Sequence, residues 1–145
     1  MITVSELTSV TEDAIRELDV LAKELRGEAG NETPATKEDV ERIVGDPSVI
    51  LMTVQDAGRI IGMGALYVHQ KVGKRVAEVE DVVVSGDYRG QGLGEKLMRA
   101  ILEKARANGI RSVSLTSRPS RVAAHKLYEK LGFEKRETDV FRLKL

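Results

Sequence analysis

The residues with the clearest chemical potential form a glycine-rich turn, Arg-Gly-Gln-Gly-Leu-Gly, from Arg89 to Gly94. The β-branched run Val82–Val84 and a short turn precede it, and an amphipathic helix follows at once. The first turn of a helix has backbone N–H groups without helical acceptors, and the helix dipole adds partial positive charge there. The pattern therefore predicts an anion site, most often for phosphate. The alternative is a strand-to-helix connection that binds no ligand.

The spacing of the glycines separates three kinds of phosphate site. A P-loop ends in Gly-Lys-Ser/Thr, whereas Gly94 is followed by Glu95 and Lys96. A dinucleotide fingerprint counted from Gly90 would need a glycine where Glu95 stands. The pattern that fits is Arg-x-x-Gly-x-Gly, which begins at Arg89. It resembles the pyrophosphate-binding signature of the GNAT acetyltransferase superfamily, whose members bind acetyl-coenzyme A (acetyl-CoA).

A second motif near the C-terminus agrees with this resemblance. Leu127-Tyr128 followed by Leu131-Gly132-Phe133 resembles the other signature of the superfamily, and its distance from Gly94 also fits. Both signatures occur in the family's order, so the chain is identified as a GNAT member. One position departs from the pattern: relatives often have Asn seven residues before the tyrosine, and this chain has Arg121. We expect Arg121 to contact the cofactor through its charge rather than through an amide.

The resemblance implies where the cofactor lies. The strand that ends at Val84 is expected to splay from the next parallel strand and to offer its free backbone edge to the pantetheine arm. An N–H group near Val83 or Val84 would then polarise the thioester carbonyl, and Tyr128 would act as general acid. The alternative for Tyr128 is a core tyrosine with its hydroxyl at the surface. The implied cofactor contacts are Val82, Val83, Val84, Arg89, Gly90, Gln91, Gly92, Leu93, Gly94, Glu95, Arg121 and Tyr128.

Acyl transfer to an amine also needs a base, because the amine must be neutral to attack a thioester. Strand alternation predicts that Glu78, Glu80, Val82 and Val84 share one face, with Asp81 on the other. We rank Glu80 first as the base, Glu78 second and Asp81 third. Two neighbouring carboxylates would raise each other's pKa, which suits a base that works near neutral pH and a cationic acceptor.

The local pattern Val-Glu-Asp-Val is similar to that of glucosamine-phosphate acetyltransferases, whose acids help to hold the sugar. This similarity makes Glu80 and Asp81 candidate substrate contacts. The alternative for each carboxylate is a solvated side chain on a strand. Further determinants of the acceptor are expected in residues 27–35, 67–72 and 134–139.

The elements that position these residues follow from periodicity and caps. The expected caps are Thr11, a capping box of Thr36 with Asp39, and a C-terminal glycine cap at Leu131-Gly132-Phe133. The order β, α, α, β, β, β, α, β, α, β, β predicts one α+β domain on a mixed sheet over residues 1–145. The resemblance implies the GNAT fold, with about seven strands flanked by four helices. The expected strands are 2–7, 49–55, 59–69, 76–84, 112–117, 133–136 and 139–143, and the expected helices are 12–26, 37–44, 92–107 and one capped by Ser120, with a loop at 27–34.

Composition excludes several other functions. The 145 residues suit one domain, and the formal net charge of zero gives no general attraction to nucleic acid or to anionic membranes. The chain has no cysteine and only two histidines, so no metal site is expected. The first residues lack the features of a signal peptide, and no apolar run approaches the ~20 residues of a membrane span. We therefore expect a cytoplasmic protein.

Two classes of function remain at this stage. The first is an N-acetyltransferase that transfers the acetyl group of acetyl-CoA to a primary amine of a small molecule or a protein. The second is a module of the same fold that binds CoA or acetyl-CoA as a sensor or interaction partner without turnover. The presence of Tyr128 and of the Glu78 and Glu80 pair favours the enzyme. A homodimer formed through the late strands is expected by analogy with the superfamily.

Overall fold

The computed structural model describes residues 1–27 and 34–145. The chain divides into two compact units, Met1–Leu115 and Thr116–Leu145, and each is described here by itself. The predicted loop at 27–34 falls almost wholly on residues outside the described ranges. The single domain over residues 1–145 stays a prediction.

The first unit is built on a five-stranded mixed sheet in the order β1-β2-β3-β4-β5. Neighbours from β1 to β4 are antiparallel, and β4 and β5 are parallel. A mixed sheet with a strand–helix–strand connection to a parallel neighbour was predicted, and it is confirmed. The strands are β1 (Ile2–Glu6), β2 (Val49–Asp56), β3 (Arg59–Lys71), β4 (Lys74–Val84) and β5 (Val113–Ser114).

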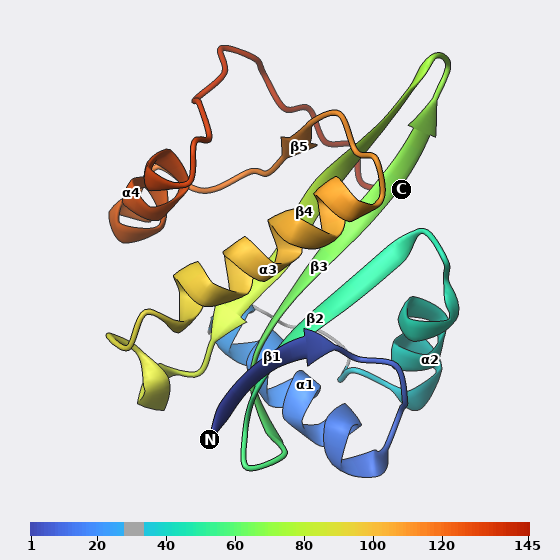
Figure 1. The fold of residues 1–145 in the computed structure, drawn as a ribbon, viewed down its shortest axis with the longest axis vertical. Coiled ribbons are helices and arrows are strands. Elements are labelled where there is room, and N and C mark those ends of the chain that lie inside the picture. The colour runs from blue at the N-terminus through green and yellow to red at the C-terminus, as the bar shows by residue number, and fades with distance from the viewer. Residues whose placement is uncertain (28–33) are drawn as a thin grey trace. The chain divides into compact units, whose positions relative to one another are not determined.

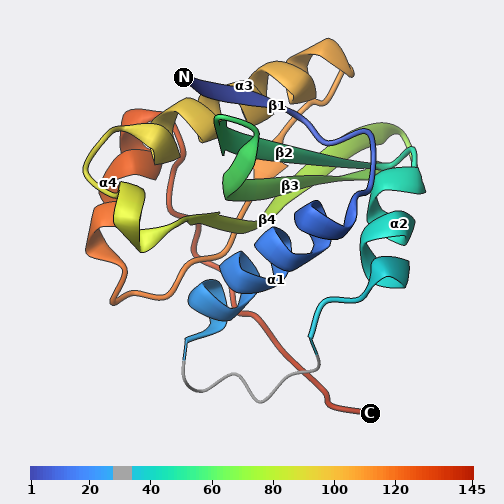
Figure 2. The ribbon, with the colours of Figure 1, turned by 90° about the horizontal axis from the view of Figure 1, so that it is seen from below.

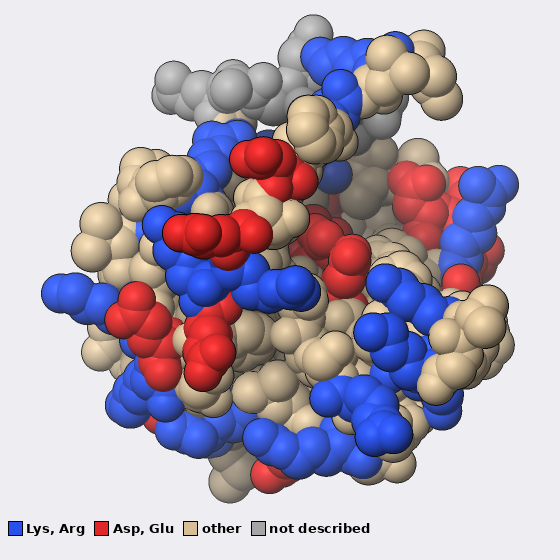
Figure 3. All heavy atoms as spheres, turned by 90° about the horizontal axis from the view of Figure 1, so that it is seen from above, with Lys and Arg blue, Asp and Glu red and all other residues tan. Residues whose placement is uncertain are grey.

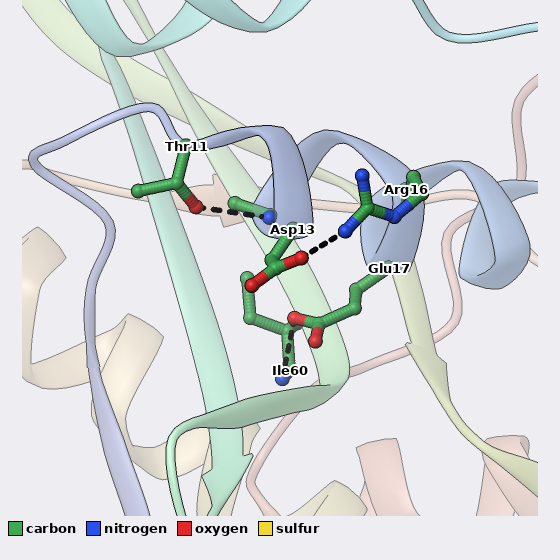
Figure 4. A network of polar contacts seen from close by, with 6 residues as sticks. Thr11, Asp13, Arg16, Glu17 and Ile60 are labelled. Atoms are coloured by element: carbon green, nitrogen blue, oxygen red, sulfur yellow. Dashed lines mark hydrogen bonds and ion pairs between the residues drawn. The ribbon is translucent and has the colours of Figure 1, made fainter.

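Side-chain caps begin the first two helices, as predicted. The Thr11 hydroxyl accepts a hydrogen bond from the Ala14 N–H group at the start of α1 (Glu12–Arg26). Figure 4 shows this cap beside the Glu17 carboxylate, which accepts from the backbone N–H of Ile60 on β3. Thr36 forms a capping box at the start of α2 (Lys37–Gly45). The two threonine caps satisfy N–H groups in the first turns of α1 and α2 that would otherwise face solvent.

The helices of the first unit cover both faces of its sheet. Figure 2 shows α1 on one face and α3 (Leu93–Ala107) on the other. Apolar residues of α1 and Val40 of α2 pack in one cluster against β2, β3 and β4. Periodicity predicts an apolar stripe on α3 that also includes Leu102, which is half-buried. The other residues of the stripe are buried: Leu93, Leu97, Met98, Ile101 and Ala105. This packing fixes the end of β4 between two helical layers.

The second unit contains α4 (Val122–Lys130). Its N-cap is Arg121 without a side-chain cap bond, so the predicted Ser120 cap is wrong: the helix begins one residue too late for the serine hydroxyl to serve it. Its C-terminal cap was predicted correctly. Gly132 has a φ of +99°, and the N–H groups of Phe133 and Gly132 donate to the carbonyls of Tyr128 and Glu129. These bonds form a Schellman motif, which glycine favours.

The predicted closing strands at 133–136 and 139–143 are wrong for this structure, because no strand is assigned among the described residues after Ser114. Phe141 and Leu143 are 91% and 82% exposed. Strands need a neighbour to pair their backbone groups, and β5 is only two residues long. The predicted strand at 112–117 is correspondingly shorter, so the sheet has five strands instead of about seven.

Candidate functional site

A bulge near the end of β4 decides where the candidate catalytic side chains point. Glu80 pairs with Ala65 of β3 and Val83 with Met63, so Asp81 and Val82 together lie opposite Gly64. Asp81 has a φ of +56°, which lets the strand accommodate the extra residue. A Cβ atom on Gly64 would lie 2.8 Å from Cδ1 of Ile101 on α3. The glycine therefore allows α3 to approach β3 at the bulge.

This bulge makes the predicted alternation wrong. Paired residues on antiparallel strands have side chains on the same face. Glu80 therefore lies on the face of Ala65, which packs in the α1 cluster. A Cβ atom on Gly64 would meet Val82 and side chains of α3, so Val82 lies on the opposite face. Glu78 and Glu80 share the α1 face with Val83, and not with Val82 and Val84 as predicted.

The surroundings of Glu80 change its protonation. Partial burial and the negative charges of Asp81 and Glu78 raise the pKa of Glu80 above its usual value. The Glu80 residue is still exposed to solvent overall, so water reaches its carboxylate. Glu78 lies 3.7 Å from Nε2 of His69 on β3. The side chains thus form a site that can hold a cation and take a proton.

Tyr67 belongs to the same face, because it pairs with Glu78 across β3 and β4. Its ring is half-buried, and burial together with the charges of Asp81, Glu80 and Asp46 raises the pKa of its hydroxyl group. From its position in the sequence, Tyr67 is expected only to lie in a segment that contacts the acceptor. Its nearness to Glu80 depends on the pairing register, which no local pattern reveals.

Beyond its short pairing with β5, the outer backbone edge of β4 pairs with no other strand among residues 1–27 and 34–145. Only Ala77 and Glu78 pair with β5, and Figure 1 shows β4 continuing past it toward the turn into α3. The Ser85 N–H group donates to the Ile61 carbonyl of β3. Because N–H groups alternate between the two edges of a strand, those of Val84 and Val82 point to the edge away from β3. The resemblance implies that the pantetheine arm lies along this edge, and this position stays a prediction.

The glycine turn leads from this edge into α3. Gly90 and Gly92 have φ values of +77° and +72°, and Gly92 is the N-cap of α3. Whereas threonine hydroxyls cap α1 and α2, no side chain caps α3. The first helical bond runs from the Lys96 N–H to the Gly92 carbonyl, and earlier N–H groups lie at the positive end of the helix dipole.

These features suit a diphosphate, whose oxygens need several donors and space for close approach. Arg89, Gly90, Gln91 and Gly92 are exposed, and nothing within 4 Å would meet a Cβ atom on either glycine. Leu93 is 6% exposed and packs into the core, so only its backbone can face a ligand. The donor set of the turn therefore fits the group that the sequence predicts.

Tyr128 and Arg121 belong to the second unit. The Phe133 ring packs edge-on against the Tyr128 ring, with centroids 5.8 Å apart. The Schellman cap brings these two residues together, which explains why leucine, glycine and phenylalanine follow the tyrosine at this spacing. Burial raises the pKa of the Tyr128 hydroxyl, and the positive charge of Arg121 acts in the opposite direction. The hydroxyl is therefore protonated at neutral pH.

The described residues show no metal site and no membrane-spanning helix. Within residues 1–27 and 34–145, no group of three or more His, Cys, Asp or Glu side chains could hold a metal ion. No helix in that part of the chain is long and apolar enough to cross a membrane. Figure 3 shows lysine and arginine side chains interspersed with acidic ones over the face that it draws.

Known proteins resemble this chain in sequence and in fold. Glucosamine 6-phosphate N-acetyltransferase of Trypanosoma brucei brucei is 40% identical over 86 residues, which cover 57% of this chain and 56% of the relative. The chain thus matches little more than half the length of that relative. The crystal structure of a Trypanosoma brucei acetyltransferase has a TM-score of 0.77 and 29% identity, with complete coverage of both chains.

A third comparison concerns fold alone. The structure of AAC(6')-Iy in complex with a CoA-containing bisubstrate analogue has a TM-score of 0.80 at 21% identity, covering 100% of this chain and 99% of that one. GNAT acetyltransferases use acetyl-CoA as the acetyl donor.

The profile of the Acetyltransferase (GNAT) family matches residues 13–133, which include both signatures and span both units. The chain belongs to the acetyltransferase (GNAT) family.

Proposed function

We propose that this protein is an N-acetyltransferase that transfers the acetyl group of acetyl-CoA to a primary amine by direct attack. One observation carries the proposal: the end of β4 joins three features that acyl transfer needs. Its bulge holds Glu80 among other carboxylates, its outer edge past Glu78 pairs with no strand of the described residues, and it leads through the glycine turn into a helix N-terminus without a side-chain cap. Family membership supports the same reaction.

We assign the cofactor contacts to the backbone rather than to side chains. When bound, acetyl-CoA supplies an activated acetyl thioester. The N–H groups of Val82 and Val84 would hydrogen-bond along this outer edge of β4. Because the N–H group of Val83 faces β3, that of Val84 would polarise the thioester carbonyl. The turn from Arg89 to Glu95 would hold the diphosphate, with the charge of Arg121 assisting.

The catalytic roles follow from protonation states. Glu80, whose raised pKa brings it closer to neutral pH, would take the proton of the acceptor ammonium directly or through water. Glu78 is the second candidate for this role. Tyr128, whose raised pKa keeps its hydroxyl protonated, would donate a proton to the leaving thiolate.

We propose an amino sugar phosphate as the first acceptor to test. The Trypanosoma brucei brucei relative is named for glucosamine 6-phosphate. Glu80 and Asp81 would bind the cationic amine and the sugar. Their negative charge favours an ammonium group over a neutral acceptor.

The activity is tested by release of free thiol from acetyl-CoA over a panel of amines. The panel should contain glucosamine 6-phosphate, glucosamine, aminoglycosides, polyamines and a lysine peptide. We expect turnover with at least one amine, and a higher kcat/KM for glucosamine 6-phosphate than for glucosamine. Binding of CoA without turnover for any amine would contradict the enzyme and favour the sensor module.

Assembly is a second part of the proposal. We infer that both units act as one acetyltransferase domain, because the family profile spans them. We also propose a homodimer in which the late segment pairs with the partner. Exposed apolar residues at alternate positions support this pairing, because an extended segment would place them on one face: Phe141, Leu143 and Leu145. A monomer mass in light scattering at micromolar concentration would contradict the dimer.

Burial is the main cause of the raised Glu80 pKa, and the charge of Asp81 is expected to move the acid limb of the pH profile further in the same direction. Asp81→Asn removes a negative charge that raises the pKa of Glu80, so this pKa should fall. Because the base works deprotonated, activity would then persist to lower pH. The measurement is kcat/KM against pH, and the acid limb should move to lower pH than in wild type. Asn tolerates a positive φ, so the bulge should survive; an unmoved limb would contradict this coupling.

A further inference from the structure

A single-turn 3-10 helix, η1 (Gly86–Tyr88), connects β4 to the glycine turn. Its own backbone bonds are local: the Tyr88 N–H donates to Ser85, and the Arg89 N–H donates to Gly86 at a long 3.4 Å. A 3-10 turn of this length has weak hydrogen-bond geometry and little stability by itself. Yet it sets the direction in which the chain enters the glycine turn, so contacts from elsewhere must orient it.

Two side chains from distant parts of the sequence supply such contacts. The Tyr88 hydroxyl donates to Oδ2 of Asp56, the last residue of β2, at 2.8 Å in a partly buried position. On α1, Oε2 of Glu24 accepts from the Gly86 N–H group at 3.1 Å. One contact holds the end of η1 next to Arg89, and the other holds its beginning. The turn is thereby tied to both the sheet and α1.

The charges of these partners point to a positioning role. Asp56 and Glu24 are carboxylates, and negative charge near a diphosphate site weakens the attraction for the ligand. They also accept the hydrogen bonds of the Tyr88 hydroxyl and the Gly86 N–H group, so these two donors bind other residues of the protein instead of a phosphate. Direct ligand contact therefore does not explain their placement, whereas fixing the path of the backbone does.

We propose that Tyr88 is a positioning residue for cofactor binding, which acts through its hydrogen bond to Asp56 and is assisted by the Glu24 contact to Gly86. The two contacts hold η1 so that the N–H groups of the following turn converge on the diphosphate. This inference rests on the proposed role of residues 89–95 as the diphosphate site.

The test is calorimetric titration of Tyr88→Phe with CoA and with ADP, which shares the diphosphate. The variant keeps the ring and loses only the donor to Asp56. A hydrogen bond to a charged group typically contributes enough for about a ten-fold change in an equilibrium, so we expect Kd for both ligands to rise about ten-fold. At saturating acetyl-CoA, kcat should stay within two-fold of wild type while KM for acetyl-CoA rises.

Matched variants separate positioning from stability and charge. Thr11→Ala also deletes a single hydroxyl hydrogen bond, but at the start of α1 and away from the turn, so Kd for CoA should be unchanged. Glu24→Gln keeps an oxygen that can accept from Gly86, whereas Glu24→Ala does not. Only the alanine variant should raise Kd. Faster amide hydrogen exchange in residues 86–94 of Tyr88→Phe would support the same conclusion without ligand.

Two results would overturn the inference. Kd values for CoA and ADP within two-fold of wild type in Tyr88→Phe would show that the contact does not position the turn. An equal rise in Kd for Thr11→Ala would attribute the effect to general stability. If the wild-type protein bound neither CoA nor ADP, the proposed diphosphate site itself would be contradicted. Titration of the wild-type protein alone gives this result, so it is distinguished from a failure of the Tyr88 inference, which appears only in the variants.

Discussion

Glu80→Gln is expected to lower kcat about 10²–10³-fold at neutral pH, since general base catalysis typically contributes 10²–10⁴-fold. Glutamine keeps the size of the side chain and its place opposite Ala65 on the α1 face of β4, but it cannot take a proton. The acid limb of the pH profile should disappear together with the activity. The measurement is steady-state thiol release with the best acceptor of the amine panel, from pH 5 to pH 9.

Glu78→Gln is the matched control for this prediction. It removes a neighbouring carboxylate from the same strand and face, and we expect a smaller loss of kcat. Kd for CoA should stay close to wild type in both variants, because their side chains lie away from the glycine turn. A larger loss in Glu78→Gln than in Glu80→Gln would exchange the two roles, and near-normal activity in both would contradict a carboxylate base.

Tyr128→Phe is expected to lower kcat by about 10²-fold, because it removes the hydroxyl that would protonate the leaving thiolate. The ring and its edge-on contact with Phe133 can remain, so the C-terminal cap of α4 should be unaffected. The basic limb of the pH profile should change as well, because the raised pKa of the hydroxyl places its deprotonation at alkaline pH. Single-turnover rates at saturating cofactor provide the measurement.

Phe133→Leu is the companion variant. It keeps an apolar contact and the hydroxyl, but it loses the aromatic packing that orients the tyrosine. We expect a smaller loss of kcat than in Tyr128→Phe. Wild-type single-turnover rates in Tyr128→Phe would contradict the acid role and would leave the tyrosine as a packing residue.

Local signals in the sequence predicted much of this fold. Thr11 and the Thr36 capping box begin their helices as expected, and Gly132 ends α4 in the expected cap. These features depend on a few neighbouring residues, so the sequence contains the information directly. The glycine turn was predicted for the same reason, because the spacing of its glycines reflects the backbone conformation of the turn.

Side-chain facing at the end of β4 could not be predicted this way. Alternation assumes a regular strand, and one extra residue at Asp81 inverts the faces of everything beyond it. The only local hint was Gly64, a glycine inside a strand, and this residue lies on the neighbouring strand. The prediction of the two closing strands was wrong for a related reason. Apolar residues alternate around Phe141 as they do in a strand, but this pattern does not identify a neighbouring strand with which the segment could pair.

The central claim is that backbone N–H groups of the glycine turn bind the diphosphate of acetyl-CoA, and calorimetric titration of CoA into wild type and Gly92→Val tests it most directly. Gly92 and Gly73, with φ values of +72° and +86°, both have open space where a Cβ atom would stand. Valine at either position introduces backbone strain of the same kind, but only position 92 lies in the glycine turn. We predict binding in wild type and in Gly73→Val, with Kd at least ten-fold weaker in Gly92→Val. Equal binding in all three proteins, or no heat with wild type, would contradict it.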